Sequence, residues 1–189
     1  GWGTGSNDEL FTRQELIERF NLEGISGGNA VFNTEKLDWF NHQHLLRLSD
    51  DELLRRLGLT PDQKTRAILP LLRPRAKKLT DFPDQMRPFF EAPASYDPDA
   101  VRKQLSAPGT KEHLAALRDT FAAAEWSEAP IEKALRDLAD ARTVKAGMLI
   151  QGTRIAMTGR MVSPGLFEML VLLGRETVLR RLDALVKTL

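Results

Sequence analysis

The chain has 189 residues, of which 42% are hydrophobic and 28% are charged, a balance typical of a folded globular protein. It contains no cysteine, so disulfides and thiolate metal sites are excluded, and a reducing compartment such as the cytoplasm is the expected location. No apolar run reaches the roughly 20 residues that a membrane-spanning helix needs, so we expect no membrane association. The length is that of one domain or two small ones.

The formal net charge of +1 conceals an uneven distribution. Residues 66–87 contain six lysines and arginines but two acidic residues, and residues 151–189 contain six against three. Residues 1–65 and 88–150 are net negative. Local basic zones are typical of a surface that meets a phosphate backbone, although solvated helix faces produce the same pattern. The charge distribution alone leaves both interpretations open.

Helix-start signals recur along the chain. A side-chain oxygen followed three residues later by Glu or Gln can satisfy two free backbone N–H groups, and this pattern begins at Thr12, Ser49 and Thr60. Other starts place a proline in the first turn, where its missing N–H costs nothing. These are Asp97-Pro98, Ser127 with Pro130, and Ser163-Pro164. Glycines at the expected C-cap positions are Gly58 and Gly174.

Apolar residues between these signals recur at spacings of three and four, the period of an amphipathic helix. The runs are Leu16 to Phe20, Leu37 to Leu45, Leu114 to Phe121, Ile131 to Leu138 and Leu179 to Leu185. No segment alternates strictly between apolar and polar residues, and no Asn-Gly or Asp-Gly hairpin signal occurs, so strands are not expected. The sequence therefore predicts an all-α fold.

Prolines crowd the centre of the chain. Each lacks an amide donor and restricts the residue before it, so we expect these prolines to kink or end helices. They are Pro70, Pro74, Pro83, Pro88, Pro93 and Pro98. We place a domain boundary near residues 88–97.

The histidines offer little for catalysis or metal binding. His42 and His44 are two residues apart, so on a helix they point in different directions, and no third ligand has a recognisable spacing. We therefore expect no metal site and no catalytic residue. Neither glycine-rich phosphate-binding motif occurs. A small hydrolase that uses His42, His44 and Asp50 remains an alternative.

The segment Arg73-Pro74-Arg75, followed by Lys77 and Lys78, concentrates positive charge where a proline interrupts a helix. Exposed guanidinium groups there could form hydrogen-bond forks to bases and phosphates, or stack on unpaired bases. Cations at a helix C-terminus also complement the helix dipole, which is the alternative explanation.

A second candidate site begins at Ser163-Pro164-Gly165-Leu166. The free N–H groups of a capped helix start can bind a phosphate or a base edge, and Arg154 and Arg160 upstream supply positive charge. A simple helical hairpin around Gly174 is the alternative explanation.

Seven segments form an ordered set across the chain. They are Gly1-Trp2, Glu9 to Leu16, Ala30-Val-Phe32, Glu35-Lys-Leu-Asp-Trp-Phe-Asn41, Arg73-Pro-Arg75, Met157-Thr-Gly-Arg-Met-Val-Ser-Pro-Gly-Leu-Phe-Glu168 and Leu172 to Glu176. Together they resemble the C-terminal half of bacterial-type glutamyl-tRNA synthetases. The resemblance covers essentially the whole chain, and its longest segments are specific. The chain departs from many members of the family at Asn41-His-Gln-His-Leu45.

The resemblance implies an anticodon-binding helical cage of two small subdomains, residues 26–92 and 93–189, preceded at residues 1–25 by the tail of a stem-contact segment. The family's catalytic domain, which uses ATP and Mg²⁺, would lie upstream, and neither of its His-Ile-Gly-His-like and Lys-Met-Ser-Lys-Ser-like motifs occurs here. We therefore expect a monomeric fragment of a glutamate–tRNA ligase that binds the anticodon loop of tRNA-Glu, needs no cofactor and is not catalytically competent by itself.

The resemblance also assigns site residues. Arg75 matches the family arginine that meets the first anticodon base and helps to separate glutamate-specific from non-discriminating enzymes. Arg154 matches a basic residue beside the anticodon, and the turn around an anticodon base matches Ser163, Pro164 and Leu166. Arg73 and Arg160 are further candidate contacts. A helical protein-interaction module that contacts acidic partners remains the alternative function.

Overall fold

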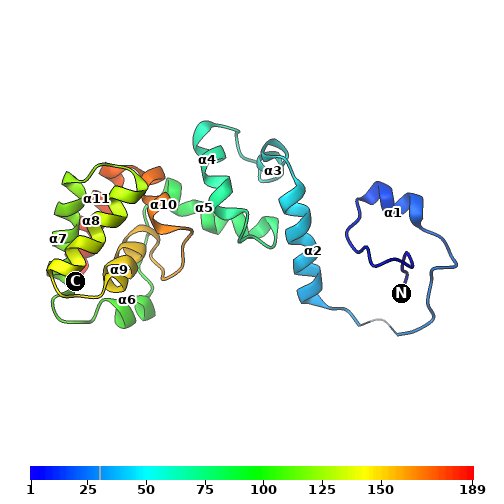
Figure 1. Ribbon diagram of the computed structural model, residues 1–189, viewed down its shortest axis with the longest axis horizontal. Helices are drawn as coiled ribbons and strands as arrows, with labels where there is room; N and C mark the ends of the chain where they lie inside the picture. The colour runs from blue at the N-terminus through cyan, green and yellow to red at the C-terminus, as the bar shows by residue number, and fades with distance from the viewer. Residues whose placement is uncertain (30) are drawn as a thin grey trace.

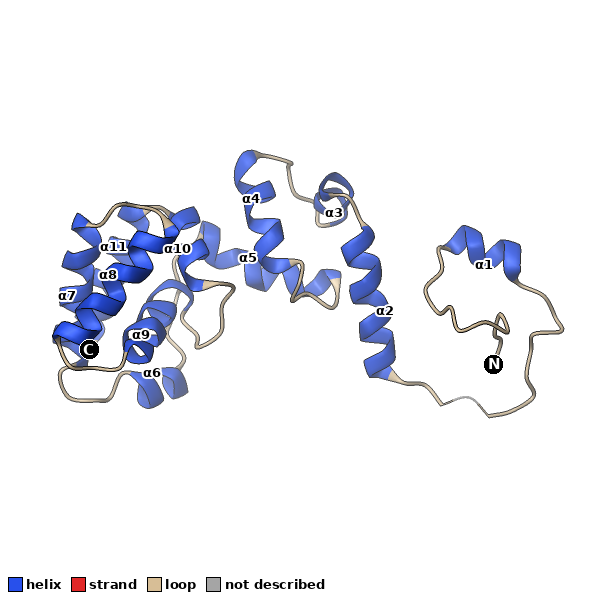
Figure 2. Cartoon of the chain, viewed as in Figure 1, coloured by secondary structure: helices blue, strands red, loops and turns tan. Residues whose placement is uncertain are grey.

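The computed structural model describes residues 1–29 and 31–189; Ala30, part of the segment Ala30-Val-Phe32, lies outside the described residues. The described chain forms eleven α-helices and one short 3-10 helix, with no strand (Figures 1 and 2). A lone antiparallel bridge joins Trp2 to Ile25. None of the described helices is long and apolar enough to cross a membrane. The all-α prediction is confirmed.

From α2 onward, the helices follow one another with short connections. The first half contains α1 (Arg13–Arg19), α2 (Thr34–Arg47), α3 (Asp50–Arg56), α4 (Gln63–Leu72), η1 (Leu79–Asp81) and α5 (Phe82–Phe90). The second half contains α6 (Pro98–Gln104), α7 (Thr110–Ala123), α8 (Glu128–Ala141), α9 (Ala146–Thr158), α10 (Leu166–Leu173) and α11 (Arg175–Thr188).

The core runs through most of this length. Helices α7 and α9 pack against each other, and each contacts both α8 and α11. Helix α10 contacts α8 as well as α4 and α5, so it joins the two halves. Figure 1 shows the resulting bundle at one end of an elongated molecule, with α4 and α5 between it and α2. Fully buried side chains such as Leu53, Phe82, Phe121 and Ile131 belong to one continuous cluster.

The N-terminal segment differs from the rest. Thr12 caps α1 in a reciprocal capping box with Glu15, as predicted. However, none of the described residues before Leu45 is buried, and Ile17 and Phe20 of the predicted apolar run are 61% and 55% exposed. The ring of Phe20 packs against Trp2 with centroids 5.6 Å apart. Residues 1–29 therefore form local structure without contributing to the core.

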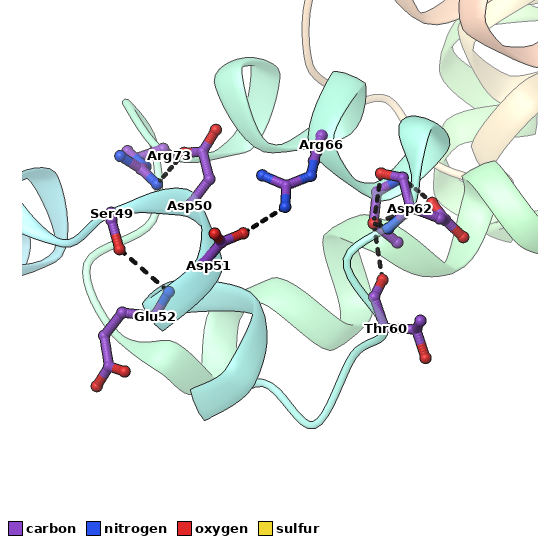
Figure 3. Close-up of polar contacts among 9 residues, drawn as sticks. Ser49, Asp50, Asp51, Glu52, Thr60, Asp62, Arg66 and Arg73 are labelled. Atoms are coloured by element: carbon purple, nitrogen blue, oxygen red, sulfur yellow. Dashed lines mark hydrogen bonds and ion pairs between the residues drawn. The ribbon is translucent and has the colours of Figure 1, made fainter.

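The predicted helix starts are confirmed in part. Ser49 accepts from the backbone N–H of Glu52, and Asp97 caps α6 with Pro98 at its first position. The prediction at Thr60 is wrong, because α4 begins two residues later with Asp62 as its cap (Figure 3). The Asp62 carboxylate accepts from both the N–H and the hydroxyl of Thr65, at 2.7 and 3.0 Å. An ionised acceptor makes stronger caps than a hydroxyl.

The central prolines are predicted to kink or end helices. Pro70 and Pro88 do not end their helices but lie inside α4 and α5. Their neighbours Leu69 and Phe89 are buried, so tertiary packing outweighs the lost backbone hydrogen bond. Pro164 is not in a first helical turn, because α10 begins at Leu166 with Gly165 as its N-cap.

A buried arginine joins the ends of two helices. Arg181 of α11 is 4% exposed, and its guanidinium donates to the carbonyl oxygens of Pro88, Glu91 and Met157, each at 2.7 Å. The first two carbonyls belong to the end of α5 and the third to the end of α9. Charge-assisted bonds of this kind are about twice as strong as neutral ones, so Arg181 fixes these two helix ends relative to each other.

The connection after α5 is held at Gly159. This residue has a φ of +75°, and its carbonyl oxygen accepts from the N–H of Asp97 at 2.8 Å. A Cβ atom there would lie 2.5 Å from the carbonyl oxygen of Ser95 and 3.2 Å from the Cβ of Pro93. Only glycine allows both the left-handed conformation and this close approach. Residues 93–97 are thereby held against the end of α9.

Candidate nucleic-acid interface

Two arginines that are far apart in the sequence meet at Ser163. Arg75 lies on the loop after α4 and is exposed, and its Nη1 donates to the carbonyl oxygen of Ser163 at 2.5 Å, across 88 positions. Arg154 of α9 donates from Nε to the Ser163 hydroxyl at 2.9 Å. That hydroxyl in turn donates to the carbonyl oxygen of Pro164 at 2.8 Å. The turn before α10 therefore orients both guanidinium groups.

These two guanidinium groups repel each other. Burial lowers the pKa of Arg154, and the nearby positive charge of Arg75 lowers this pKa further. An anion placed between like charges relieves this cost. Each guanidinium has five N–H donors, so one bond apiece to Ser163 leaves donors for a ligand. The pair is thus suited to binding a phosphate or the acceptor edge of a base.

A cavity of about 700 Å³ opens beside this pair, and we call it the Ser163 cavity. This volume lies within the usual range for ligand sites. Four of the predicted site residues line it, namely Arg75, Arg160, Ser163 and Pro164. Arg154 reaches the cavity's edge through its bond to Ser163. Val162, which is 78% exposed, adds an apolar surface to the lining.

The lining also contains carboxylates, which the sequence analysis did not identify. Asp84 is paired with Arg87 at 3.0 Å, and the Asp97 side chain accepts from the N–H of Asp99 at 2.9 Å. Glu91 has an exposed carboxylate, and no hydrogen bond or ion pair of this side chain is found among the described residues. Its backbone is held by Arg181. No sequence pattern marks Glu91, because its position depends on this long-range contact.

Two predicted site residues have other surroundings. Arg73 donates to the carbonyl oxygen of Leu48 at 3.0 Å and to the Asp50 carboxylate at 2.6 Å, and its side chain is 18% exposed (Figure 3). It therefore ties the end of α4 to the junction of α2 and α3. Leu166 is 4% exposed and packs in the core. The side chains of these two residues do not line the Ser163 cavity.

Residues 35–186 match the model of the anticodon binding domain, which is most of the chain. The chain belongs to this family.

Similar proteins extend the assignment of the anticodon-binding domain. A glutamate–tRNA ligase 2 of Koribacter versatilis is 43% identical over 96% of this chain and 41% of its own length. A glutamate–tRNA ligase of Anaeromyxobacter sp. (strain Fw109-5) is 38% identical over 97% of this chain and 40% of its own length. The crystal structure of a glutamate tRNA ligase from Elizabethkingia meningosepticum matches with a TM-score of 0.87 and 25% identity, over 100% of this chain and 39% of that one.

The chain thus spans about two fifths of the length of these relatives. The domain is homologous to the C-terminal part of glutamyl-tRNA synthetases, and their catalytic domain is absent from this chain. The resemblance identified from the sequence is confirmed.

The two histidines considered as metal ligands, His42 and His44, both lie on α2. His42 Nδ1 lies 2.8 Å from the carbonyl oxygen of Ala76. Within residues 1–29 and 31–189, no group of three or more His, Asp or Glu side chains is placed to hold a metal ion. His42 thus joins α2 to the segment after α4, whereas His44 on the same helix is exposed.

Proposed function

We propose that this domain reads the anticodon loop of tRNA-Glu with Arg75, Arg154, Arg160, Ser163 and Pro164 around the Ser163 cavity. The observation that carries the proposal is the convergence of Arg75 and Arg154 on one serine across 88 and 9 positions of sequence. Sequence-specific RNA recognition targets unstacked loop bases, which are read by guanidinium planes, hydroxyls and backbone groups. The cavity offers all three.

The proposed cage consists of subdomains 26–92 and 93–189, preceded by the stem-contact tail at 1–25. Arg75 comes from the first subdomain and Ser163 from the second, so the proposed site lies where they meet. In this arrangement Arg73 and Leu166 act indirectly. Arg73 places the loop that carries Arg75, and Leu166 anchors the turn that carries Ser163.

The parent protein would attach glutamate to tRNA, as the names of the relatives indicate for those proteins. ATP and Mg²⁺ would bind in a catalytic domain outside this chain, and the described residues have no cluster that fits the metal. We further propose that the parent acts in the cytoplasm as a monomer. Because position 75 is arginine, we expect the parent to prefer tRNA-Glu over tRNA-Gln, and comparable charging of both would contradict this.

The test is equilibrium binding of the 189-residue chain to tRNA-Glu transcripts with each anticodon base changed in turn. Arg75→Gln should weaken cognate binding by about 1–3 kcal/mol and relax discrimination at one anticodon position, the expected loss of one forked base contact. Arg180→Gln is the matched control, because Arg180 is an exposed arginine on α11 outside the cavity lining. Identical binding ratios for parent and Arg75→Gln across all anticodons would exclude Arg75 as a reader.

A further inference from the structure

A second cavity, of about 610 Å³, lies between α1, α2, the end of α3 and η1. We call it the basic groove. Its charged lining consists of Arg13, Arg47, Arg56 and Lys78, joined by His44, and none of the lining residues is acidic. The Ser163 cavity, in contrast, has three acidic residues in its lining. The two cavities therefore suit ligands with different chemistry.

Two of the cations in the basic groove are paired with carboxylates that are not part of its lining. Arg56 pairs with Glu52 at 2.7 Å, and Lys78 pairs with Asp38 at 3.0 Å. Arg13 and Arg47 are exposed, and in the part of the chain that the structure describes neither forms an ion pair. Glu15 is the nearby acid that Arg47 influences, and its carboxylate accepts from the N–H of Thr12 at 2.6 Å. Two guanidinium groups thus retain free donors toward the groove.

Helix ends explain only part of this charge. His44 and Arg47 lie in the last turn of α2, and Arg56 lies in the last turn of α3, where cations are favourable. A helix C-terminus carries roughly half a negative charge. Arg13 belongs to neither end, because it opens α1. The groove therefore collects more positive charge than the helix dipoles require.

The groove is close to the Ser163 cavity along the chain. Lys78 lines the groove and Arg75 lines the cavity, so two residues separate the two linings in the sequence. The three Cα–Cα steps from Arg75 to Lys78 span at most roughly 11 Å. A nucleic-acid backbone carries phosphates at a much closer spacing than that. The backbone of one RNA strand therefore carries phosphates on the length scale that separates these two lining residues.

We propose that the basic groove binds backbone phosphates of the RNA whose anticodon enters the Ser163 cavity, with Arg13 and Arg47 as the main contacts. This inference rests on the proposed function. Phosphate contacts fix the register of a nucleic acid on the protein but carry no sequence information directly. The charged side chains of the groove are all basic, which suits the negative charge of phosphate oxygens.

The test measures binding of the full 189-residue chain to tRNA-Glu transcripts at several salt concentrations. Arg47→Gln and Arg13→Gln should each lower affinity by the same factor for every anticodon variant. Each should also reduce the slope of log affinity against log salt by about one, and the double variant by about two. Arg180→Gln should leave both quantities unchanged. Since all three arginines are exposed, circular dichroism should report the same helix content for every variant.

Three results would overturn the proposal. The first is an Arg13→Gln/Arg47→Gln variant with the parent's affinity and salt slope. The second is an effect of Arg47→Gln that depends on the anticodon base, which would make Arg47 a base reader. The third is competition by polyglutamate as strong as by RNA of equal charge, with the same dependence on Arg47, which would point to an acidic protein partner. Arg75→Gln in the same series tests the proposed function separately. This variant should change the discrimination between anticodon bases, whereas the residues of the basic groove stay the same.

Discussion

The loop after α4 contributes Arg75 to the Ser163 cavity and Lys78 to the basic groove, yet the linings of the two cavities differ. The cavity combines three arginines with three carboxylates, whereas the charged side chains of the groove are all basic. Base edges present both donors and acceptors, so a surface that reads them needs both kinds of group. Phosphates present acceptors only. The charge composition of a cavity can therefore distinguish a site that recognises bases from a site that binds the phosphate backbone.

The largest expected effect comes from replacing Arg181, which holds two helix ends that line the Ser163 cavity and do not line the basic groove. Arg181→Met removes the donor to three carbonyl oxygens at the ends of α5 and α9. The bond to Met157 is buried and those to Pro88 and Glu91 are part-buried. An unsatisfied buried acceptor costs about 1–3 kcal/mol, so we expect a loss of roughly 3 kcal/mol in the free energy of unfolding. Urea denaturation followed by circular dichroism measures this loss.

The Arg181→Met variant should also affect RNA binding at the Ser163 cavity and leave the basic groove unaffected. Anticodon discrimination should fall, because both helix ends line the Ser163 cavity, while the salt slope assigned to the groove should persist. Arg180→Met, on the same helix, is the control and should leave stability nearly unchanged. An unfolding midpoint shared by Arg181→Met and the parent would show that the buried guanidinium does not join the helix ends as described.

Gly159→Ala tests the close approach of residues 93–97 to α9. Its φ of +75° strains any other residue, and the new Cβ would lie 2.5 Å from the carbonyl oxygen of Ser95. We expect a loss of about 1–3 kcal/mol in stability, together with weaker anticodon discrimination. Gly58→Ala is a matched control, since its φ is +69° with nothing within 4 Å of a Cβ. Equal losses for both variants would mean that backbone strain alone matters at Gly159.

Glu91→Gln tests whether the cavity reads a base through an acceptor. A carboxylate accepts from the exocyclic amine of a base such as cytosine and repels a keto oxygen at the same place, whereas an amide tolerates both. We expect the preference for the amine-bearing base at one anticodon position to relax by about 1 kcal/mol. Binding to paired cytosine and uracil transcripts measures it. Asp84→Asn, whose carboxylate is already engaged by Arg87, should leave the ratio unchanged.

Local chemistry explains why much of the fold could be predicted from the sequence. The capping residues Thr12, Ser49 and Asp97 act on backbone groups within three residues, so their signals are read directly. The start of α4 was misplaced because Thr60 and Asp62 compete within one turn. The burial of Arg181 could not be anticipated, since its acceptors lie 24 to 93 positions away.

In the candidate site, too, local signals could be read from the sequence and long-range contacts could not. Charge and helix-start signals predict Arg75 and Ser163 as parts of two separate candidate sites. Only the resemblance to a family assigns both residues to one site, because no local rule links residues 88 positions apart. Arg73 was expected beside Arg75 as a contact, and its bond to Asp50 instead turns it toward α3. Adjacent arginines on a proline-interrupted segment thus point to different partners. Sequence proximity is a weak guide to which guanidinium faces a ligand.

The smallest expected effect is a gain of RNA binding. Hydrogen bonds from Arg55 and Arg56 lower the pKa of Glu52 from 4.5 to about 2, so this carboxylate is ionised near neutral pH. Its stabilising contribution is complete above pH 4.5 and is lost only as the pH falls toward 2. Glu52→Gln at neutral pH releases Arg56 toward the basic groove.

We expect the Glu52→Gln variant to bind every anticodon variant slightly more tightly at low salt, with a salt slope steeper by at most about one. The control is Glu132→Gln, which frees Arg136 from an equivalent pair on α8, outside both cavities. If both variants gain affinity equally, the gain reflects overall charge and the groove has no special role. A gain confined to Glu52→Gln would place a phosphate within reach of Arg56, because surface ion pairs otherwise contribute little.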